Sequence, residues 1–154
     1  MIKIKKNSAI ITGSSKGIGA EIAKKLSRDG YSVVINYLNE KEKAEAVLEE
    51  IKKSGGNGFV YQADVTKAEQ VEKMVSKTVE VYGDIDVLIN NASHNIINKN
   101  FKSLEWSDFE IHLNTLLKGA FNTCKFLIPL MEKKGKGKII NITSIYADGV
   151  PPTK

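Results

Sequence analysis

The chain has 154 residues, of which 42% are hydrophobic, and it carries a formal net charge of +5 at pH 7. This length is typical of one domain with a sizeable core. No apolar run approaches the roughly 18 residues of a membrane span, and the lysine-rich start lacks the apolar segment of a secretion signal, so we expect neither a membrane partner nor secretion.

Charge and cysteine usage narrow the class further. The one cysteine, Cys124, excludes an internal disulfide framework and favours a reducing, cytoplasmic location. An excess of lysine invites a nucleic-acid interpretation, but most lysines alternate with glutamates, as at residues 40–43, which indicates a solvated surface. We therefore expect no nucleic-acid partner, and we expect no metal site.

The first part of the chain alternates a strand pattern with a helix pattern. Residues 8–11 form a short apolar run and predict a buried strand. Apolar residues at helical spacing over 18–26 predict a helix, which the pair Asp29 and Gly30 ends. The β-branched and aromatic run at 31–37 predicts the second strand.

The same alternation continues beyond residue 40. Apolar residues over 44–51 predict a second helix, and residues 59–63 a third strand. Residues 66–69 (TKAE) match a capping box that would start the third helix, with Thr66 bonding forward and Glu69 reaching back. The nearly continuous apolar run 85–89 predicts a fourth strand that is covered on both faces.

A long helix is predicted over residues 106–131. Its apolar side chains cover more than one narrow face, so we expect one side to meet the sheet and the other a partner subunit. Pro129 should bend or fray its last turn. Residues 139–142 predict a fifth strand.

Successive β-α units with crossovers of this length predict parallel pairing. The expected fold class is therefore α/β, with a doubly wound parallel sheet of Rossmann type. We expect residues 1–154 to form one dinucleotide-binding domain that contains five strands and lacks a C-terminal part of the fold.

The run TGSSKGIG at residues 12–19 lies between the first strand and the first helix. Its three glycines, Gly13, Gly17 and Gly19, allow backbone N–H groups to close on a phosphate at the start of a helix. Such a run alone is a weak signal, because glycine-rich turns occur in many folds. Further motifs at the ends of the later strands make it strong.

Those motifs are Asp64 and Val65 after the third strand, the run 90–92 (NNA) after the fourth, Asn114 in the long helix, and Ser144 after the fifth. With the glycine run they resemble the short-chain dehydrogenase/reductase family over essentially the whole chain. Within that family the pattern is similar to bacterial 3-oxoacyl-carrier-protein reductases and to sugar or steroid alcohol dehydrogenases; an enoyl reductase or an epimerase stays open.

The resemblance implies an NAD(P)-dependent oxidoreductase that interconverts a carbonyl and an alcohol on a small molecule. It also implies a homodimer or homotetramer that assembles through the helix at 106–131. A different class of function stays open as well. The chain could be a non-catalytic nucleotide-binding or dimerisation fragment.

The resemblance also implies which residues bind the cofactor. The glycine run would hold the pyrophosphate, Asp64 and Val65 the adenine, and the segment 91–93 the nicotinamide ribose. Ser93 replaces a usual glycine and should be tolerated, whereas Asp64 read alone is equally a turn residue that leads into a helix. The full expected set is Gly13, Ser15, Lys16, Gly17, Ile18, Gly19, Asn36, Leu38, Asp64, Val65, Asn91, Ala92 and Ser93.

Cofactor choice depends on the end of the second strand, where NAD enzymes place an acid for the ribose 2′-hydroxyl. Here Asn36 stands at that end, and no acid follows until Glu40. Lys16 lies where NADP-preferring relatives often carry a base, although many of those enzymes have an arginine where Leu38 stands. We expect NADP rather than NAD.

Catalysis in the family uses a serine, a tyrosine and a lysine, supported by an asparagine. Ser144 matches the serine and Asn114 the asparagine, which in the family bends the long helix. The Tyr-x-x-x-Lys stretch of the family would lie beyond Lys154. We therefore expect the 154-residue chain to be inactive and the working protein to be longer. His94 is interpreted as a surface loop residue rather than one that faces substrate.

Overall fold

The computed structural model describes residues 7–95, 97 and 99–143. Its five strands form one parallel sheet in the order β3-β2-β1-β4-β5. Their bounds are β1 Ser8–Ile11, β2 Ser32–Tyr37, β3 Asn57–Gln62, β4 Val87–Asn90 and β5 Lys138–Asn141. The predicted fold class and all five predicted strands are confirmed, with ends that differ by one or two residues except in β1, which matches.

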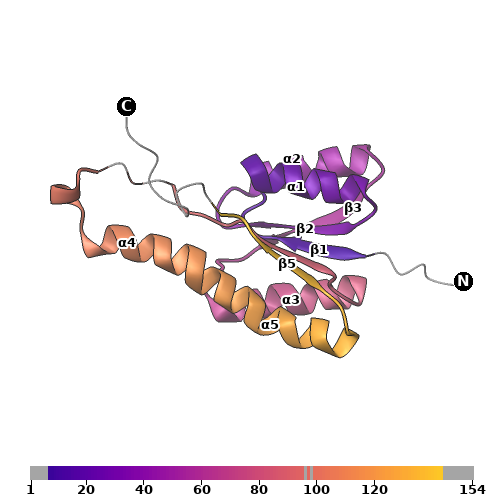
Figure 1. Cartoon of the computed structure of the whole chain (residues 1–154). Coiled ribbons are helices and arrows are strands. Elements are labelled where there is room, and N and C mark those ends of the chain that lie inside the picture. The colour runs from indigo at the N-terminus through magenta and orange to yellow at the C-terminus, as the bar shows by residue number, and fades with distance from the viewer. Residues whose placement is uncertain (1–6, 96, 98, 144–154) are drawn as a thin grey trace, which may run out of the picture.

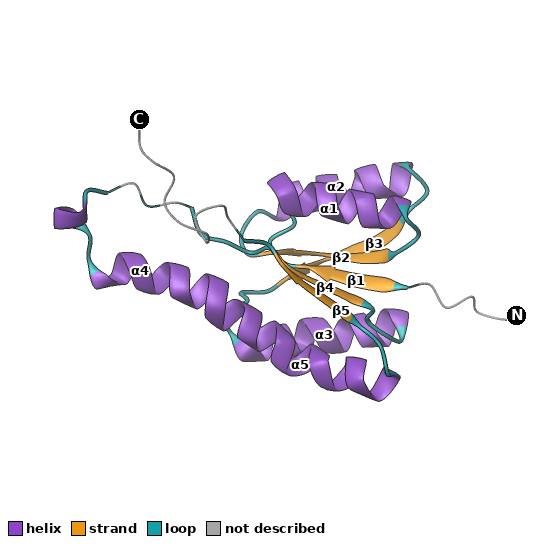
Figure 2. Cartoon of the chain, in the orientation of Figure 1, coloured by secondary structure: helices purple, strands orange, loops and turns teal. Residues whose placement is uncertain are grey.

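Helices cover both faces of the sheet (Figures 1 and 2). Helices α1 (Gly17–Arg28) and α2 (Lys41–Lys53) lie side by side on one face, and α3 (Ala68–Tyr82) and α5 (Gly119–Lys134) on the other. Alternate residues of β1 supply the two cores, since Ala9 and Ile11 join the α1–α2 cluster while Ile10 joins the α3–α5 cluster. Both faces of the central strands are therefore buried.

The start of α3 differs from the predicted capping box. The helix begins at Ala68, and its N-cap Lys67 makes no side-chain cap hydrogen bond. Asp64 and Gln70 hold the entry instead: the Asp64 carboxylate accepts the Thr66 N–H at 2.9 Å, and the Gln70 amide oxygen accepts the Asp64 N–H at 2.7 Å. The capping-box prediction was wrong because the Asp64 carboxylate, and not Glu69, accepts the Thr66 N–H.

The predicted long helix is present as three segments in one continuous rod, α4 (Trp106–Leu113), a π-helical segment Asn114–Lys118, and α5 (Figure 1). At the junction the Gly119 N–H donates to the Asn114 carbonyl, which is the longer reach of a π turn. The helix continues past Pro129 to Lys134, so the predicted fraying is wrong. Leu127 and Met131 are buried on either side of the proline, and their packing holds this turn together.

Among the described residues, this rod has one buried side. Leu127 has no exposed surface, whereas Leu117 is 66% and Phe121 63% exposed. The expectation that one side meets the sheet is confirmed. The described part of the chain leaves the other side uncovered.

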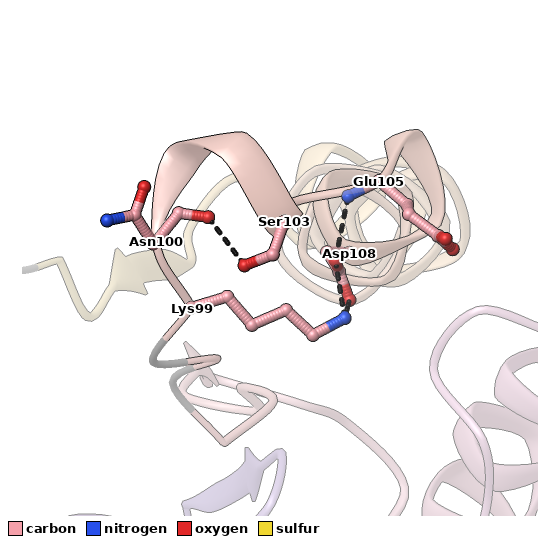
Figure 3. Close-up of polar contacts among 5 residues, drawn as sticks. All are labelled: Lys99, Asn100, Ser103, Glu105 and Asp108. Carbon is pink, nitrogen blue, oxygen red and sulfur yellow. Dashed lines mark hydrogen bonds and ion pairs between the residues drawn. The ribbon is translucent and has the colours of Figure 1, made fainter.

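The start of α4 is secured by polar contacts (Figure 3). The Asp108 carboxylate accepts the Glu105 N–H at 2.9 Å and pairs with the Lys99 ammonium at 2.8 Å. These two contacts hold the pKa of Asp108 below its ordinary value.

Within the described part of the chain, no helix combines the length and apolarity that a membrane crossing needs.

Candidate functional site

The carboxyl ends of four neighbouring strands open onto one cavity of about 480 Å³, called here the polar cavity. Its walls come from the loop after β1, the residues 38–40 after β2, the residues 63–65 after β3 and the residues 91–95 after β4. Parallel sheets bind ligands at this edge, next to the strand where the winding direction reverses. The location alone marks a binding site.

The glycine run brings the β1 loop unusually close to the β4 loop. Gly13 has φ +59°, and a Cβ built on it would lie 2.8 Å from the Ala92 Cα. A Cβ on Gly19 would lie 2.4 Å from the Asn91 Nδ2. No side chain fits at either position without moving backbone or a bonded amide.

Thr12 and Asn91 lock the two loops together. The Thr12 hydroxyl accepts the N–H groups of Asn91 and Ala92 at 2.9 and 3.0 Å. In return the Asn91 amide donates to the carbonyls of Thr12 and Gly13 at 3.0 and 2.9 Å. Thr12 itself is 2% exposed and does not line the polar cavity, so it shapes that cavity by holding the two loops together.

Helix α1 points its first turn at the polar cavity. Residues 15–18 line the cavity, and the first turn of α1 contains no acidic side chain. The first N–H groups of a helix lack intrahelical acceptors and carry a partial positive charge. This end of α1 is therefore suited to an anion such as a phosphate.

Asn36 borders the cavity, yet its side chain is engaged inside the protein and only 2% of the residue is exposed. Its Oδ1 accepts the Gly13 N–H at 3.0 Å, and its Nδ2 donates to the Ala63 carbonyl at 3.0 Å. Its backbone N–H donates to the Ser14 hydroxyl at 3.1 Å. Asn36 thus ties the glycine run to the end of β3 and leaves ligand contact at this corner to the residues that follow it.

One acid and two lysines meet at that corner. The Glu40 carboxylate pairs with Lys16 at 2.8 Å and also contacts Lys43. These hydrogen bonds, first from Lys16 and then from Lys43, hold the pKa of Glu40 below its ordinary value. Lys16 and Glu40 both line the polar cavity.

Asp64 lies where both sequence interpretations placed it. It lines the polar cavity, and its carboxylate accepts the Thr66 N–H in the turn before α3. The neighbouring Val65 is 6% exposed, and its backbone carbonyl accepts a hydrogen bond from the side-chain amide of Asn122 in α5 at 2.8 Å. Helix α5 therefore helps to place this wall of the site.

A second cavity of about 560 Å³, called here the apolar cavity, adjoins the first. The two cavities share Val65, Ala92 and Thr115 as lining residues. The rest of its wall comes from Thr12, the ends of β4 and β5, the π segment and the start of α5, including Leu116, Leu117 and residues 141–143. The two cavities are therefore adjacent at this wall.

Of the two predicted catalytic residues, Asn114 and Ser144, the described part of the structure includes only Asn114. Asn114 begins the π segment but does not line either cavity, whereas the next residue, Thr115, lines both. Ser144 lies outside the described residues. His94 is exposed, borders the polar cavity, and stacks edge-on against His112 of α4 with ring centroids 5.7 Å apart.

Most of the predicted cofactor residues are brought together by the fold. All of them except Gly19 line the polar cavity, and Gly19 packs directly beneath it against Asn91. The expected cofactor set left out several residues of the wall or its support, namely Thr12, Tyr37, Asn39, Glu40, Ala63, His94, Asn95 and Thr115. Glu40 could have been found from its distance after the glycine run, where an acid often contacts a ribose.

Comparisons with known proteins agree with this geometry. The family model described as short chain dehydrogenase matches residues 7–152. The chain is 44% identical over 141 residues to a 3-oxoacyl-(acyl-carrier-protein) reductase of Staphylococcus epidermidis, covering 90% of this chain and 56% of that protein. It is 33% identical over 140 residues to glucose 1-dehydrogenase 2 of Bacillus subtilis, covering 90% and 54%.

A solved structure is similar as well. It is a metagenomic short-chain oxidoreductase in complex with NADP, 29% identical, with a TM-score of 0.86 over 95% of this chain and 65% of that chain. The chain spans about half the length of the curated relatives it matches.

Proposed function

The chain belongs to the short-chain dehydrogenase family, and we propose that it forms the cofactor-binding part of an NADP-dependent oxidoreductase. The proposed reaction interconverts a carbonyl and an alcohol on a small molecule. The observation that carries the proposal is the close approach of Gly13 and Gly19 to the β4 loop, which leaves the start of α1 open to a phosphate.

The residues of the polar cavity fit a dinucleotide along its length. The glycine run and the first turn of α1 would bind the pyrophosphate, with Asp64 and Val65 beside the adenine. Asn91, Ala92 and Ser93 would border the nicotinamide ribose. Lys16 supports the choice of NADP, because its ammonium lies at the cavity wall, where it could pair with a 2′-phosphate.

The apolar cavity is proposed to receive the substrate. A bound nicotinamide would supply or accept the hydride at the wall that the two cavities share. The protein would orient the carbonyl there, with Ser144 donating a hydrogen bond to its oxygen. Asn114 is proposed to support this arrangement by opening the π turn that presents Thr115 to both cavities.

Cofactor titration tests the proposal on this chain. We expect NADPH to bind more tightly than NADH, measured by the change in dihydronicotinamide fluorescence at fixed ionic strength. The physical reason is the pairing of Lys16 with the 2′-phosphate, so the difference should shrink as salt rises. Tighter binding of NADH would contradict the NADP assignment, and absence of binding by either would contradict the proposed function.

The competing proposal is a nucleotide-binding module without catalysis. Among the described residues that line the apolar cavity, no tyrosine, lysine or histidine is present to exchange a proton with a substrate oxygen. The longest available form of the protein, assayed for NADPH-dependent reduction of carbonyl compounds, decides between the two. Turnover would support the oxidoreductase, whereas tight NADPH binding without turnover of any carbonyl would support the module.

A reducing compartment such as the cytoplasm suits either proposal, since Cys124 is a free cysteine.

We also propose that the exposed side of α4 and α5 joins two copies of this protein. Its apolar residues recur every four positions: Phe109, Leu113, Leu117 and Phe121, which are 46%, 43%, 66% and 63% exposed. Such a row on one helix is a common mark of an interface. A dimer or tetramer would bury it.

Phe121→Glu is expected to shift the protein from an oligomer to a monomer, because it places a charge within the exposed apolar row of the proposed interface. Light scattering coupled to size exclusion would measure the mass. Lys133→Glu, at an exposed position of the same helix that lies off this row, is the control. An unchanged mass for the Phe121 variant would exclude this side of the helix as the interface.

A further inference from the structure

The chain contains two histidines, and the fold brings them together from different elements. His94 follows β4 and lies on the wall of the polar cavity, whereas His112 lies in the last turn of α4. Their rings meet edge-on, with centroids 5.7 Å apart and planes at 90°. Edge-on contact is a favourable arrangement for two aromatic rings. A cavity loop and a helix are therefore joined through two imidazoles.

The loop after β4 is anchored at its start. The Thr12 hydroxyl accepts the N–H groups of residues 91–92. Within the described part of the chain, residues 93–95 make no hydrogen bond to another element. All three line the polar cavity. The contact of His94 with His112 is therefore well placed to hold this part of the cavity wall against α4.

The hydrogen bond of His94 defines which of its nitrogens can take up a proton. Its Nδ1 lies 3.2 Å from the Asn95 carbonyl oxygen, which can only accept. In the neutral ring Nδ1 therefore carries the proton, and Nε2 is the nitrogen that can gain a second one. Histidine is the side chain whose charge ordinarily changes between pH 5 and 8. Two neutral rings attract in this arrangement, but two charged rings at the same distance repel.

On the α4 side, the charged groups beside the pair are Asp108, one turn before His112, and Lys99 (Figure 3). The Asp108 carboxylate accepts the Glu105 N–H at 2.9 Å and pairs with Lys99 at 2.8 Å. These contacts, in that order, lower the pKa of Asp108, and the charge of His112 lowers it to a smaller degree. Since Lys99 already occupies this carboxylate, it compensates a second charged ring only weakly.

On the cavity side, His94 shares its wall with Lys16, Glu40 and Asp64. Lys16 and Glu40 pair with each other at 2.8 Å, and the Asp64 carboxylate accepts the Thr66 N–H at 2.9 Å. Among the described residues, no ion pair joins any of these groups to His94. Neither side of the pair therefore neutralises the repulsion between two charged rings.

We propose that His94 and His112 form a histidine clasp, in which His112 is a positioning residue that holds residues 93–95 in place at the polar cavity through the His94 ring, and that the clasp opens when both rings are charged. The inference rests on the proposed function, because these residues are expected to lie beside a bound dinucleotide. It adds that a contact between this loop and α4 contributes to cofactor affinity at alkaline pH and is lost at acid pH.

The first test measures the NADPH affinity of the wild-type chain and of His112→Gln by fluorescence titration at pH 8 and at pH 5.5. At pH 8 we expect the wild type to bind about fivefold more tightly, as the loss of one aromatic contact predicts. At pH 5.5 the two affinities should converge, because the clasp of the wild type is then open. Protonation of the 2′-phosphate cancels, since the two proteins are compared at the same pH with the same ligand.

Two further variants give the controls. Once His94 is replaced in His94→Gln, the additional change His112→Gln should have no further effect at pH 8, because the two residues act as one unit. Glu110→Gln changes a charge at an exposed position of α4 and should leave the affinity unchanged at both pH values. Thermal unfolding of each variant confirms that it is folded at the titration temperature.

The second test needs no nucleotide. Because the chain has two histidines, the ring protons of each can be assigned by NMR from the single variants. We expect nuclear Overhauser cross-peaks between the two rings at pH 8 and their loss at pH 5.5. Absence of these cross-peaks at pH 8, or their persistence at pH 5.5, would overturn the clasp itself.

The outcomes separate the clasp from the proposed function. If NADPH binds and His112→Gln has no effect, or lowers the affinity by the same factor at both pH values, the positioning role of His112 is overturned while the nucleotide site stands. If the wild-type chain does not bind NADPH at either pH, the proposed function fails, and the positioning role fails with it.

Discussion

Gly19→Ala is expected to abolish nucleotide binding by the chain. The new methyl group would lie 2.4 Å from the Asn91 Nδ2, 2.7 Å from the Gly13 carbonyl oxygen and 2.9 Å from the Ser14 Cα. Two of these contacts are backbone atoms, and the third is an amide that already donates to Thr12 and Gly13. The methyl group fits only if the β1–α1 turn opens and the Asn91 amide is displaced, which separates the start of α1 from the loop after β4.

That separation would open the phosphate-binding turn and break the hydrogen bonds that join β1 to β4. We expect a loss of NADPH affinity of at least about 100-fold and a fall in the free energy of unfolding of about 3 kcal/mol. Calorimetric titration in the cold, where the variant remains folded, measures the first quantity. Urea unfolding followed by circular dichroism measures the second.

Two other glycines separate crowding from backbone strain. Gly17 lies in the same run with φ +57°, and a Cβ there would meet nothing within 4 Å; Gly55 has φ +79° and is equally uncrowded. Alanine at either position should cost about 1 kcal/mol from strain alone. Gly17→Ala should retain far more affinity than Gly19→Ala. Equal losses of NADPH affinity in Gly17→Ala and Gly19→Ala would show that backbone strain, rather than the close approach of the loops, governs binding at the site.

Asn36→Asp is expected to destabilise the protein by about 3 kcal/mol at pH 7. The substitution keeps an acceptor for the Gly13 N–H but removes the donor that the Ala63 carbonyl accepts from, in a side chain that is 2% exposed. A buried carboxylate would then face a carbonyl oxygen. Chemical denaturation of the variant and the wild type at a series of pH values measures the effect.

The difference in stability should narrow as the pH falls. Burial, together with the Ala63 carbonyl oxygen that now faces the introduced carboxyl group, favours its protonated form, so the folded variant binds more protons than the unfolded chain. Its stability therefore rises as the pH is lowered toward the ordinary range of an aspartate. Asn7→Asp, at an exposed position, is the control and should show no such dependence.

The same variant separates two interpretations of the end of β2. From the sequence, Asn36 marks a missing acid, and an acid there would favour NADH. In the structure its side chain is 2% exposed and is hydrogen-bonded to Gly13 and Ala63, so we expect Asn36→Asp to weaken both cofactors without reversing their order. A variant that prefers NADH at full stability would show that position 36 does contact the ribose.

Local patterns predicted most of the framework because each depends on residues close in the chain. Short apolar runs located the strands, since strands buried on both faces need apolar side chains on both. The glycine run located the phosphate-binding turn. The failures were also local. The capping box was predicted from the spacing of Thr66 and Glu69, but the hydrogen bonds of Asp64 and Gln70 take its place. The disruptive effect of Pro129 was overestimated because the packing of Leu127 and Met131 cannot be seen in the sequence.

The order of the residues was therefore sufficient for the fold class, the family resemblance and the edge of the sheet that carries the site. The fold class and the edge of the sheet follow from periodicity and from a turn that only glycine can form, whereas the family resemblance rests on the motifs at the ends of the strands. The roles of Asn36, Thr12 and Glu40 arise only where β1, β2 and β4 lie side by side. A hydrogen bond or an ion pair depends on a few ångströms of separation and on burial, and residues as distant in the chain as Thr12 and Asn91 gain both only when the sheet is assembled. For that reason Asn36 changed from a missing ribose contact into a structural clamp, and Glu40 from a surface acid into the partner of Lys16.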